Sequence, residues 1–470
     1  MRRQKEIKLE QLPYIISDYF KDRKEIFLYL GSNAATPTSS IQTLTEALEE
    51  GEPRLPFIKT MHILLQGPVG FVDEGFQDKI MAYSMFSSEG VREAANEGRA
   101  FYFSITLANI HTLISKGRKF KPDIALFKIR RNPITDEISL GLSVEALHAA
   151  IEHAELVIAE EDPRMPFTHG QSLLDADAID HIIKDDVVGC YAFPPPDYSQ
   201  LGARSRRIGE LIARHFIRDG CTLQVGIGKI PDAVVSVIKD ANFRDLGVQT
   251  ELYGDGLMQL QQLGIITNRK KKVNKGYSTT SLILGSKELY EYVHLRSSIQ
   301  MRPCAYTNGE EAIRGNAPFI SINTAMGVDL YGNVWADFID SRQYYSGVGG
   351  QPDFIRALNS PNYGIPIITI RSITDHGDSK IIPAHPEGVS LTASTYDPIV
   401  VVTEYGIADL RDLTVGEKAI ALAHIAHPKV RERYLRQIYE DPYFTKPRGY
   451  TLDKLPEGVI QYEGDIKLED

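Results

Sequence analysis

The stretch that decides the fold runs from residue 207 to residue 240. It contains RIGELIARHFIRDG at 207–220, TLQVGIG at 222–228 and PDAVVSVIKD at 231–240. The first and third segments have the apolar spacing of amphipathic helices, and the second is a short apolar run that ends in glycines. A helix, a strand and a second helix in this order predict an α/β unit built on a parallel sheet.

The same alternation continues on both sides of this stretch. Other strand-like or helical runs are EIFLYLG (25–31), IQTLTEALEEG (41–51), FIKTMHILLQG (57–67), FISIN (319–323), GIPIITI (364–370) and PIVVVTEYG (398–406). The last of these is apolar almost throughout, which is typical of a strand covered on both faces. We therefore predict an α/β protein with mainly parallel sheets.

A chain of 470 residues is too long for one ordinary core, because domains commonly have about 100–200 residues. The clearest break is AFPPPD at 192–197. Consecutive prolines cannot continue a helix or a central strand. We predict an N-terminal α/β domain over residues 1–196 and a C-terminal α/β domain over residues 197–470.

The composition is globular and excludes several classes of protein. The net charge of -10 argues against a general nucleic-acid binder, which needs a basic surface. No apolar run reaches membrane-spanning length, and the N-terminal segment lacks the apolar core of a signal peptide. Cys190, Cys221 and Cys304 are far apart and have no metal-ligand spacing. We therefore expect no metal site and a reducing, cytoplasmic compartment.

The glycine turn at 226–228 is a candidate ligand site. Gly226 and Gly228 permit close backbone approach, and free N–H groups before the helix at Pro231 could hold a phosphate. The alternative is a plain strand-to-helix turn, which any α/β protein contains. A dinucleotide-dependent dehydrogenase is disfavoured because the turn lacks the third glycine of the Rossmann fingerprint.

Glu251 is a candidate catalytic carboxylate. It ends a short apolar strand in LGVQTELYGDG (246–256). Catalytic groups of parallel α/β folds gather at the carboxyl ends of strands, although a surface loop is the commonest place for any glutamate. Asp255, between two glycines, is typical of a turn.

A second glycine-rich segment is SGVGGQPDF at 346–354. Three glycines in four positions indicate unusual dihedral angles or a close approach, and such a loop can direct backbone N–H groups at an oxyanion. The flanking Tyr344, Tyr345 and Phe354 make a flexible linker the weaker interpretation.

Two histidines, His424 and His427, lie three positions apart on a predicted helix. Because no further ligand accompanies them, we expect a polar helix face or a cap before Pro428 rather than a metal site. The chain also lacks the GxSxG and HExxH motifs, so a serine hydrolase or a zinc protease has no support.

Taken in order, these segments resemble the acetyl-CoA hydrolase/transferase family, which includes 4-hydroxybutyrate and acetate-type CoA-transferases. The resemblance covers most of the chain. It rests on AATP (34–37), SEGVREAANEGRA (88–100), ISLGLS (138–143), AELVIAEED (154–162), QVGIGKIPDAV (224–234), LGVQTELYGDG (246–256), INTAMGVDLYGNV (322–334), SGVGGQPDF (346–354), SKIIP (379–383) and VVTEYGIADL (401–410).

The resemblance implies two similar α/β domains of the CoA-transferase type with the active site between them. Glu251 matches the glutamate nucleophile of the family, and Val225 with Gly349 or Gly350 would supply the oxyanion donors. The matching CoA-binding positions are Gly226, Ile227, Gly228, Lys229, Ile230, Gly349, Gly350 and Lys380.

The implied reaction moves CoA from an acyl-CoA to a carboxylic acid through a glutamyl-CoA thioester, with ping-pong kinetics. CoA esters and acids are then small-molecule substrates, with no permanently bound cofactor and no nucleic-acid or membrane partner. A homo-oligomer is also implied. The alternatives are an acyl-CoA hydrolase that uses the same intermediate and a CoA-binding protein without catalysis, which the retained Glu251 disfavours.

The chain departs from the family pattern at several positions. Gln249 stands where the family often has His, and Gly327 replaces an acid. Trp335 and the aromatic pair Tyr344 and Tyr345 stand where members of the family usually have smaller residues or a shorter segment. We expect a more crowded or more aromatic acyl pocket, and an acid other than acetate as the natural substrate.

Overall fold

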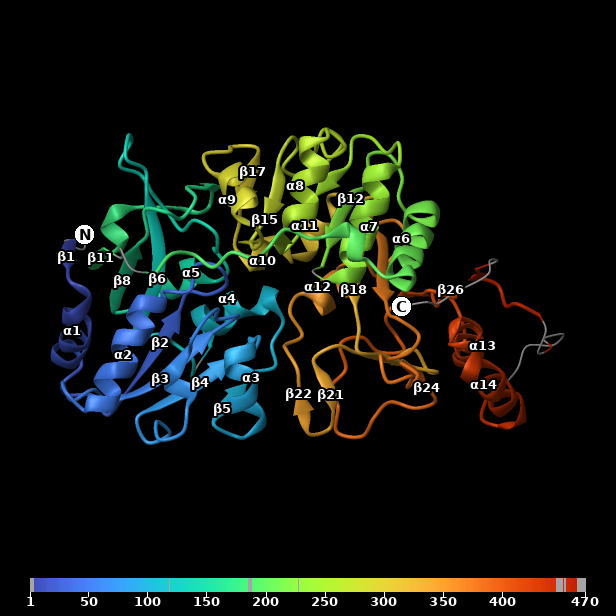
Figure 1. Ribbon diagram of the computed structural model, residues 1–470, viewed down its shortest axis with the longest axis horizontal. Coiled ribbons are helices and arrows are strands. Elements are labelled where there is room, and N and C mark those ends of the chain that lie inside the picture. Colours follow the sequence, from blue (N-terminus) through green and yellow to red (C-terminus); the bar gives the residue numbers. More distant parts are fainter. Residues whose placement is uncertain are drawn as a thin grey trace.

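The computed structural model describes residues 4–117, 119–184, 188–226, 228–444, 451 and 454–462. Ile227, one of the predicted CoA-binding residues, lies outside the described residues. Two large sheets, one from each half of the chain, lie side by side with helices against them (Figure 1).

The N-terminal sheet is parallel along its main path. Its order is β1 (Lys5–Ile7), β11 (His181–Lys184), β8 (Leu156–Glu161), β6 (Ile124–Arg131), β2 (Glu25–Leu30), β3 (Phe57–His62), β4 (Ile80–Ser84) and β5 (Ala100–Tyr102). The short strands β7 (Ile138–Ser139) and β10 (Leu173–Leu174) extend it antiparallel. The helices of this half are α1 (Leu12–Tyr19), α2 (Thr38–Glu50), α3 (Glu89–Asn96), α4 (Leu107–Lys116) and α5 (Leu147–His153).

The C-terminal sheet begins parallel and ends with two antiparallel strands. Its order is β13 (Gly247–Val248), β12 (Thr222–Val225), β18 (Phe319–Thr324), β23 (Gly364–Thr369), β25 (Val400–Thr403), β26 (Gly406–Asp409) and β27 (Val459–Gln461). The valines of β25 have no exposed surface, as predicted for a strand covered on both faces. The predicted α/β class with mainly parallel sheets is confirmed.

Smaller elements complete the C-terminal half. Its helices are α6 (Ala203–His215), α7 (Lys229–Asp240), α8 (Asp255–Gln262), α9 (Lys287–Val293), α10 (Cys304–Thr307), α11 (Glu310–Arg314), α12 (Gln351–Ala357), α13 (Val415–Ile425) and α14 (Pro428–Glu440). Its short strands are β14 (Leu252–Tyr253), β15 (Ser278–Thr280), β16 (Leu282–Ile283), β17 (Ile299–Met301), β19 (Gly327–Asp329), β20 (Val334–Trp335), β21 (Phe338–Asp340), β22 (Gln343–Tyr344) and β24 (Ile381–Ile382).

The two halves interlock through backbone pairing. β9 (His169–Gly170) of the first half pairs in parallel with β17 of the second, and Ser143 forms an antiparallel bridge to Leu282. The largest core cluster also contains buried side chains from both halves. The interface is therefore a continuous part of the hydrophobic core.

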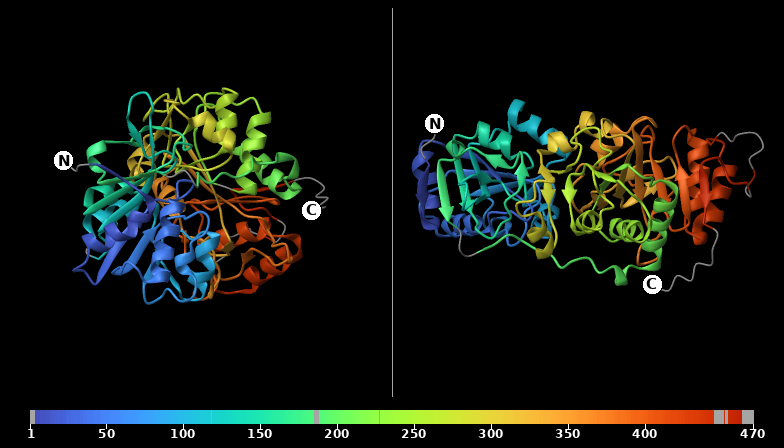
Figure 2. Two further views of the ribbon diagram at one scale, coloured as in Figure 1. Left: turned by 60° about the vertical axis from the view of Figure 1, so that its left-hand side comes forward. Right: turned by 90° about the horizontal axis from the view of Figure 1, so that it is seen from above.

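An extended linker joins β11 to α6 along one side of the molecule (Figure 2). It is bonded to both halves, since Tyr191 N–H donates to Ala34 O at 3.0 Å and Phe193 N–H donates to Gly285 O at 2.9 Å. The predicted domain boundary after residue 196 lies inside this linker and stays a prediction. The linker is thus hydrogen-bonded to the first half at Tyr191 and to the second half at Phe193.

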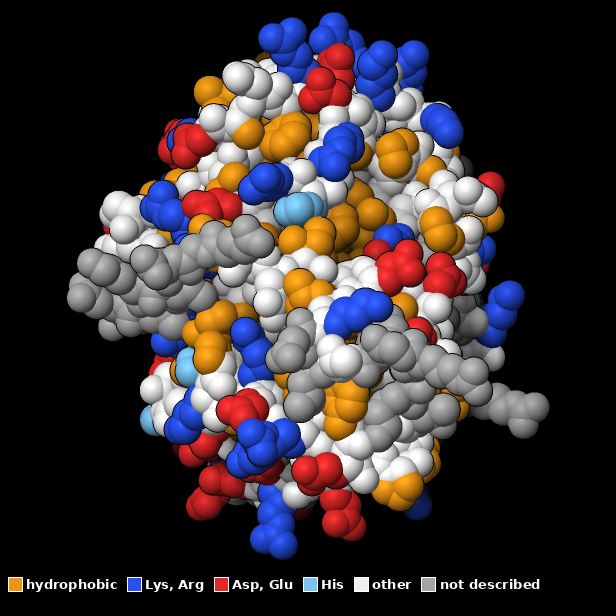
Figure 3. Space-filling view, turned by 90° about the vertical axis from the view of Figure 1, so that its right-hand side faces the viewer, with side chains coloured by type: hydrophobic (Ala, Val, Ile, Leu, Met, Phe, Trp, Pro, Cys, Tyr) orange, Lys and Arg blue, Asp and Glu red, His pale blue; other side chains and the backbone are white. Residues whose placement is uncertain are grey.

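The outer face of the C-terminal half carries basic and acidic side chains interspersed around apolar atoms (Figure 3). Among the described residues, none of the helices combines the length and the apolar character needed to cross a membrane.

Candidate active site

A cleft of about 830 Å³ is lined by both halves and by the linker. The first half contributes Leu64, Gln66, Phe86, Ser87, Ser88, Glu89 and Arg92, and the linker contributes Phe193, Pro194 and Pro196. From the second half come the two glycine-rich segments and Glu251. The segments that the sequence singled out as separate candidates therefore meet at one site.

Glu251 lies in the bend between β13 and β14, and hydrogen bonds fix its backbone there. Its carbonyl oxygen accepts hydrogen bonds from Ser281 N–H at 3.0 Å, Leu282 N–H at 2.8 Å and the Thr280 hydroxyl at 3.0 Å. These donors lie in or beside β15 and β16, which run next to the segment containing Glu251. The side chain is consequently presented from a rigid backbone.

The Glu251 side chain is partly buried in the cleft wall, and two donors hold its carboxylate. Asn308 Nδ2 donates to Oε2 at 2.9 Å, and the Gly350 backbone N–H also donates to the carboxylate. Burial raises the pKa of Glu251 to about 7, with a further increase from the charge of Asp353, while Asn308 and Gly350 oppose that increase. A poorly hydrated carboxylate of raised basicity is a better nucleophile than one in water.

The glycine loop at 347–350 approaches this carboxylate closely. A Cβ atom on Gly350 would lie 1.9 Å from Glu251 Oε2 and 2.0 Å from Asn308 Nδ2. Gly349 has a φ of +56°, which favours glycine, and a Cβ on Gly347 would lie 2.6 Å from Met85 O. The close approach predicted for this loop is confirmed.

A relay of hydrogen bonds orients Asn308. Gln249 Nε2 donates to Thr307 O at 3.0 Å, and the Thr307 hydroxyl donates to Asn308 Oδ1 at 2.8 Å. Because Oδ1 is already an acceptor, the amide presents Nδ2 to Glu251. Gln249 is fully buried and supports the site from behind.

The sequence did not single out Asn308 or assign Asp353 a role. Asn308 precedes a glycine in a segment that has the composition of an ordinary turn. Asp353 was visible only as part of the glycine-rich segment, and its link to Asn308 Nδ2 at 3.4 Å depends on the tertiary structure. Neither residue has a local signal that would have identified its contact with Glu251.

The glycine turn before α7 forms another wall of the cleft. Val225, Gly226 and Gly228 line it, and Gly228 is the N-cap of α7 with a φ of +115° and open space where a Cβ would point. Lys229 is exposed and Ile230 is packed in the core, and neither lines the cleft. Their contact with CoA stays a prediction.

Lys380 lies in the cleft wall, with Nζ 3.4 Å from Ala325 O. Burial, with the nearby charge of Arg371, lowers the pKa of Lys380 to about 8. On the opposite half, the Arg92 guanidinium stacks 4.2 Å from the centre of the Tyr345 ring. The charged side chains among the described lining residues are Glu89, Arg92, Asp232, Glu251, Asp255 and Lys380.

Two departures from the family pattern are spatially matched. Gly327 pairs with Trp335 across β19 and β20, and a Cβ on Gly327 would lie 1.9 Å from the indole ring. The glycine therefore makes room for the tryptophan. Trp335 and Tyr344 do not line the cleft, whereas Tyr345 does, beside the rings of Phe86 and Phe193.

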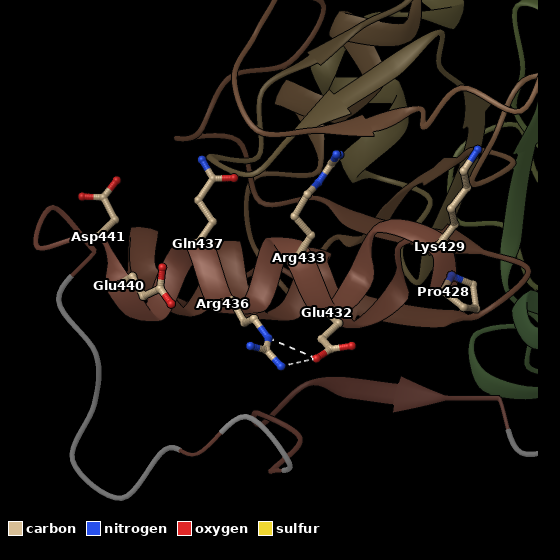
Figure 4. Close-up of a pocket in the computed structure, with 8 residues that line it drawn as sticks. All are labelled: Pro428, Lys429, Glu432, Arg433, Arg436, Gln437, Glu440 and Asp441. Atoms are coloured by element: carbon tan, nitrogen blue, oxygen red, sulfur yellow. Dashed lines mark hydrogen bonds and ion pairs between the residues drawn. The ribbon is translucent and has the colours of Figure 1, made fainter.

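The histidines predicted to be structural have structural roles. His427 Nδ1 accepts a hydrogen bond from Lys429 N–H as the N-cap of α14, and His424 is buried. A groove of about 730 Å³ runs along α14, but its lining comes from this helix and Asp441 alone (Figure 4). The described part of the chain contains no group of His, Cys, Asp and Glu that could hold a metal ion.

Comparison with known proteins matches both halves to family models. Residues 22–190 match the acetyl-CoA hydrolase/transferase N-terminal domain, and residues 285–438 match the corresponding C-terminal domain. The succinyl-CoA:acetate/propanoyl-CoA:succinate CoA transferase of Fasciola hepatica is 34% identical over 416 residues, 88% of this chain and 84% of the relative.

Two further similarities extend along most of the chain. The 4-hydroxybutyrate coenzyme A transferase of Clostridium kluyveri is 35% identical over 395 residues, 84% of this chain and 90% of the relative. The crystal structure of 4-hydroxybutyrate CoA-transferase from Porphyromonas gingivalis superimposes with a TM-score of 0.74 at 28% identity, covering 92% of this chain and 97% of that one.

Proposed function

The chain belongs to the acetyl-CoA hydrolase/transferase family and is a CoA-transferase, and we propose that Glu251 is its nucleophile. The observation that carries this proposal is the position of the Glu251 carboxylate. It lies partly buried in a cleft between the two halves, beside the backbone N–H of Gly350.

In the first half-reaction, a Glu251 oxygen attacks the thioester carbonyl of an acyl-CoA. The C–S bond breaks, CoA leaves as its thiolate, and an acyl-glutamyl anhydride remains. The thiolate then attacks the glutamyl carbonyl carbon, which releases the first carboxylic acid and leaves CoA on Glu251 as a thioester.

The second half-reaction reverses these steps with another acid. Its carboxylate attacks the glutamyl thioester carbonyl, the CoA thiolate leaves, and a new anhydride forms. The thiolate then attacks the acyl carbon of that anhydride, and Glu251 returns as the free carboxylate. Electrons and protons balance without any redox or metal participant.

Each tetrahedral step places negative charge on oxygen. Backbone amides of the glycine loop at 349–350, with that of Val225, are the proposed donors, and one such donor contributes roughly 3 kcal/mol to a transition state. The fixed backbone of Glu251 reduces the entropic cost of each attack, because the nucleophile is already oriented. Lys380, together with the turn at 226–230, is the proposed contact for CoA.

We propose small carboxylic acids as substrates. The relatives named above act on acetate, propanoyl-CoA, succinate and 4-hydroxybutyrate, so these acids and their CoA esters are the first to test. The Tyr345 ring on the cleft wall supports our hypothesis that acetate is not the preferred acid.

The alternative outcome is hydrolysis, because water can resolve the same intermediates. The decisive experiment incubates the protein with an acyl-CoA, with and without a second acid, and follows free CoA and new CoA ester. A new ester that requires the acid supports transfer. Free CoA in the absence of the acid supports hydrolysis. If neither product forms, the remaining interpretation is a protein that binds CoA without catalysis.

The nucleophile can be tested separately from the overall reaction. Mass spectrometry of peptides after incubation with acyl-CoA alone should find CoA attached to Glu251, and borohydride should reduce that thioester. Retention of full turnover by Glu251→Ala would contradict the assignment.

We further propose that the protein works as a homo-oligomer in a reducing compartment such as the cytoplasm. All three cysteines are unpaired, which agrees with a reducing environment. Light scattering of the purified protein and fractionation of cells test these two proposals.

A further inference from the structure

The side chain of Tyr102, on β5 of the first half, reaches the glycine loop of the second half. Its hydroxyl donates to Asp337 Oδ2 at 3.0 Å and accepts a hydrogen bond from Val348 N–H at 3.3 Å. Val348 lies between Gly347 and Gly349. A group from the N-terminal sheet is therefore bonded to the centre of the loop that faces Glu251.

Asp337, the acceptor for the Tyr102 hydroxyl, is fully buried and is itself hydrogen-bonded to other residues of the C-terminal half. Its carboxylate also accepts a hydrogen bond from the Ser390 hydroxyl. Its backbone oxygen accepts from Tyr345 N–H at 2.8 Å and Ser346 N–H at 3.2 Å. Because the carboxylate can only accept, the Tyr102 proton must point at Asp337, which leaves an oxygen lone pair for Val348 N–H.

Packing fixes the Tyr102 ring in the position that these bonds require. The ring lies 4.1 Å from the ring of Tyr344, at an interplanar angle of 31°, and makes an edge contact with Phe338. Burial and the Asp337 charge raise the pKa of Tyr102, so its hydroxyl stays protonated at neutral pH. The side chain of Asn96, on α3, fixes the segment that precedes the loop. Its Nδ2 donates to Tyr344 O at 3.0 Å, and its Oδ1 accepts from Tyr344 N–H at 2.8 Å.

From these contacts we propose that Tyr102 is a positioning residue for CoA transfer. Its hydroxyl, oriented by Asp337, fixes the Val348 amide so that the amides of Gly349 and Gly350 face Glu251. A loop with three glycines has no intrinsic preference for this conformation and depends on such external bonds. The inference rests on the proposed nucleophile, because its consequence for turnover acts through Glu251.

The test is Tyr102→Phe, which keeps the packed ring and removes the hydroxyl. We expect kcat to fall roughly 10- to 100-fold with less than about threefold change in KM for the acyl-CoA, since the loss affects transition-state donors. The acidic limb of the pH profile should move to higher pH, because Gly350 N–H no longer stabilises the ionised Glu251 as well. A purely structural role of Tyr102 would not produce this shift.

Tyr83→Phe is the matched control. It removes a hydroxyl from the neighbouring strand β4, where the Tyr83 ring packs against Phe101 and Phe120. It should leave kcat and the pH profile unchanged. If Tyr102→Phe does not fold, Ser390→Ala weakens the same link from the other side of Asp337 and should shift the profile in the same direction.

The titration of Glu251 can also be followed without turnover. The melting temperatures of a protein and of its Glu251→Gln variant are measured at several pH values, and their difference reports the ionisation of Glu251. In the Tyr102→Phe background this difference should begin at the same pH, which the unfolded chain sets, but should keep growing to a higher pH. An unchanged titration together with unchanged kcat overturns the positioning role. A shifted titration, together with full CoA transfer by Glu251→Gln itself, supports the loop contact and overturns the proposed nucleophile instead.

Discussion

At the residue scale, the surroundings of the Glu251 carboxylate disfavour its ionised form. Its pKa is about 7, above the ordinary value of 4.5, so the folded protein holds a proton between these two values that the unfolded chain releases. Stability therefore decreases as pH rises from 4.5 towards 7, and stays reduced above that range. Such a destabilising group is expected at this position if Glu251 is the proposed nucleophile.

Glu251→Gln should separate activity from stability. We expect CoA transfer to fall about 10³-fold or more, while unfolding at pH 8 requires roughly 1–2 kcal/mol more than in the unmodified protein. Chemical denaturation at pH 8 and pH 5 measures the gain, which should largely disappear at the lower pH. A variant less stable than the original at pH 8 would contradict the desolvation argument.

Asn308 and Asp353 should change the pH profile in opposite directions. Removing the amide donor with Asn308→Ala should move the acidic limb of kcat/KM upward from about pH 7 by roughly one unit. Asp353→Asn should move this limb downward, because it removes a negative charge that raises the pKa of Glu251. The local structure should be retained, because the amide oxygen can still accept from Ala108 N–H. Shifts of the same sign in both variants would show that another group controls this limb.

At the scale of elements, the glycine loop and α12 form one unit that begins against Glu251. Gly350 is the N-cap of α12, and the space where its Cβ would lie is already taken by the Glu251 carboxylate and the Asn308 amide. The requirement for glycine here is steric, because the φ of Gly350, at -96°, is accessible to any residue.

Gly350→Ala should therefore displace the loop or the carboxylate and reduce kcat by about 10²-fold or more. The protein should still fold, because the clash is confined to the cleft. Gly189→Ala is the control, since its Cβ would approach only the flexible side chain of Arg164, at 3.4 Å. Equal activity of the two variants would show that the observed contact is unimportant in the reaction.

At the scale of the whole molecule, the cleft has walls from both halves and a third wall from the linker. Phe193, Pro194 and Pro196 line it, and Phe193 is bonded through its backbone to Gly285. We expect this third wall to limit the access of water to the proposed glutamyl intermediate, and so to influence whether CoA passes to an acid or is lost to hydrolysis.

Phe193→Ala should raise the ratio of free CoA to new CoA ester several-fold by opening the cleft to water. The backbone bond to Gly285 remains in this variant, so the linker path should be retained. The ratio is measured at a fixed acceptor concentration, by chromatography of the CoA products. An unchanged ratio would mean that the linker side chain does not control access of water.

The sequence alone determined the α/β class and the need for close approach at 347–350, whereas Glu251, predicted to end a strand, lies three residues beyond the end of β13. The class and the close approach follow from local rules, since apolar periodicity predicts strands and helices and clustered glycines indicate backbone crowding. The linker could also be predicted from a local rule, because consecutive prolines interrupt both helices and strands.

Only the tertiary structure decided what surrounds the carboxylate. Asn308, Asp353 and Tyr102 come from segments far from Glu251 in the chain. The hydrogen bonds of Asn308 with Glu251 and Asp353 form within the C-terminal half, whereas Tyr102 reaches the glycine loop because the two halves pack against each other. The raised pKa has the same origin, since desolvation depends on everything packed around a group. Periodicity and composition report on neighbours along the chain, whereas the pKa of Glu251 depends on neighbours in space.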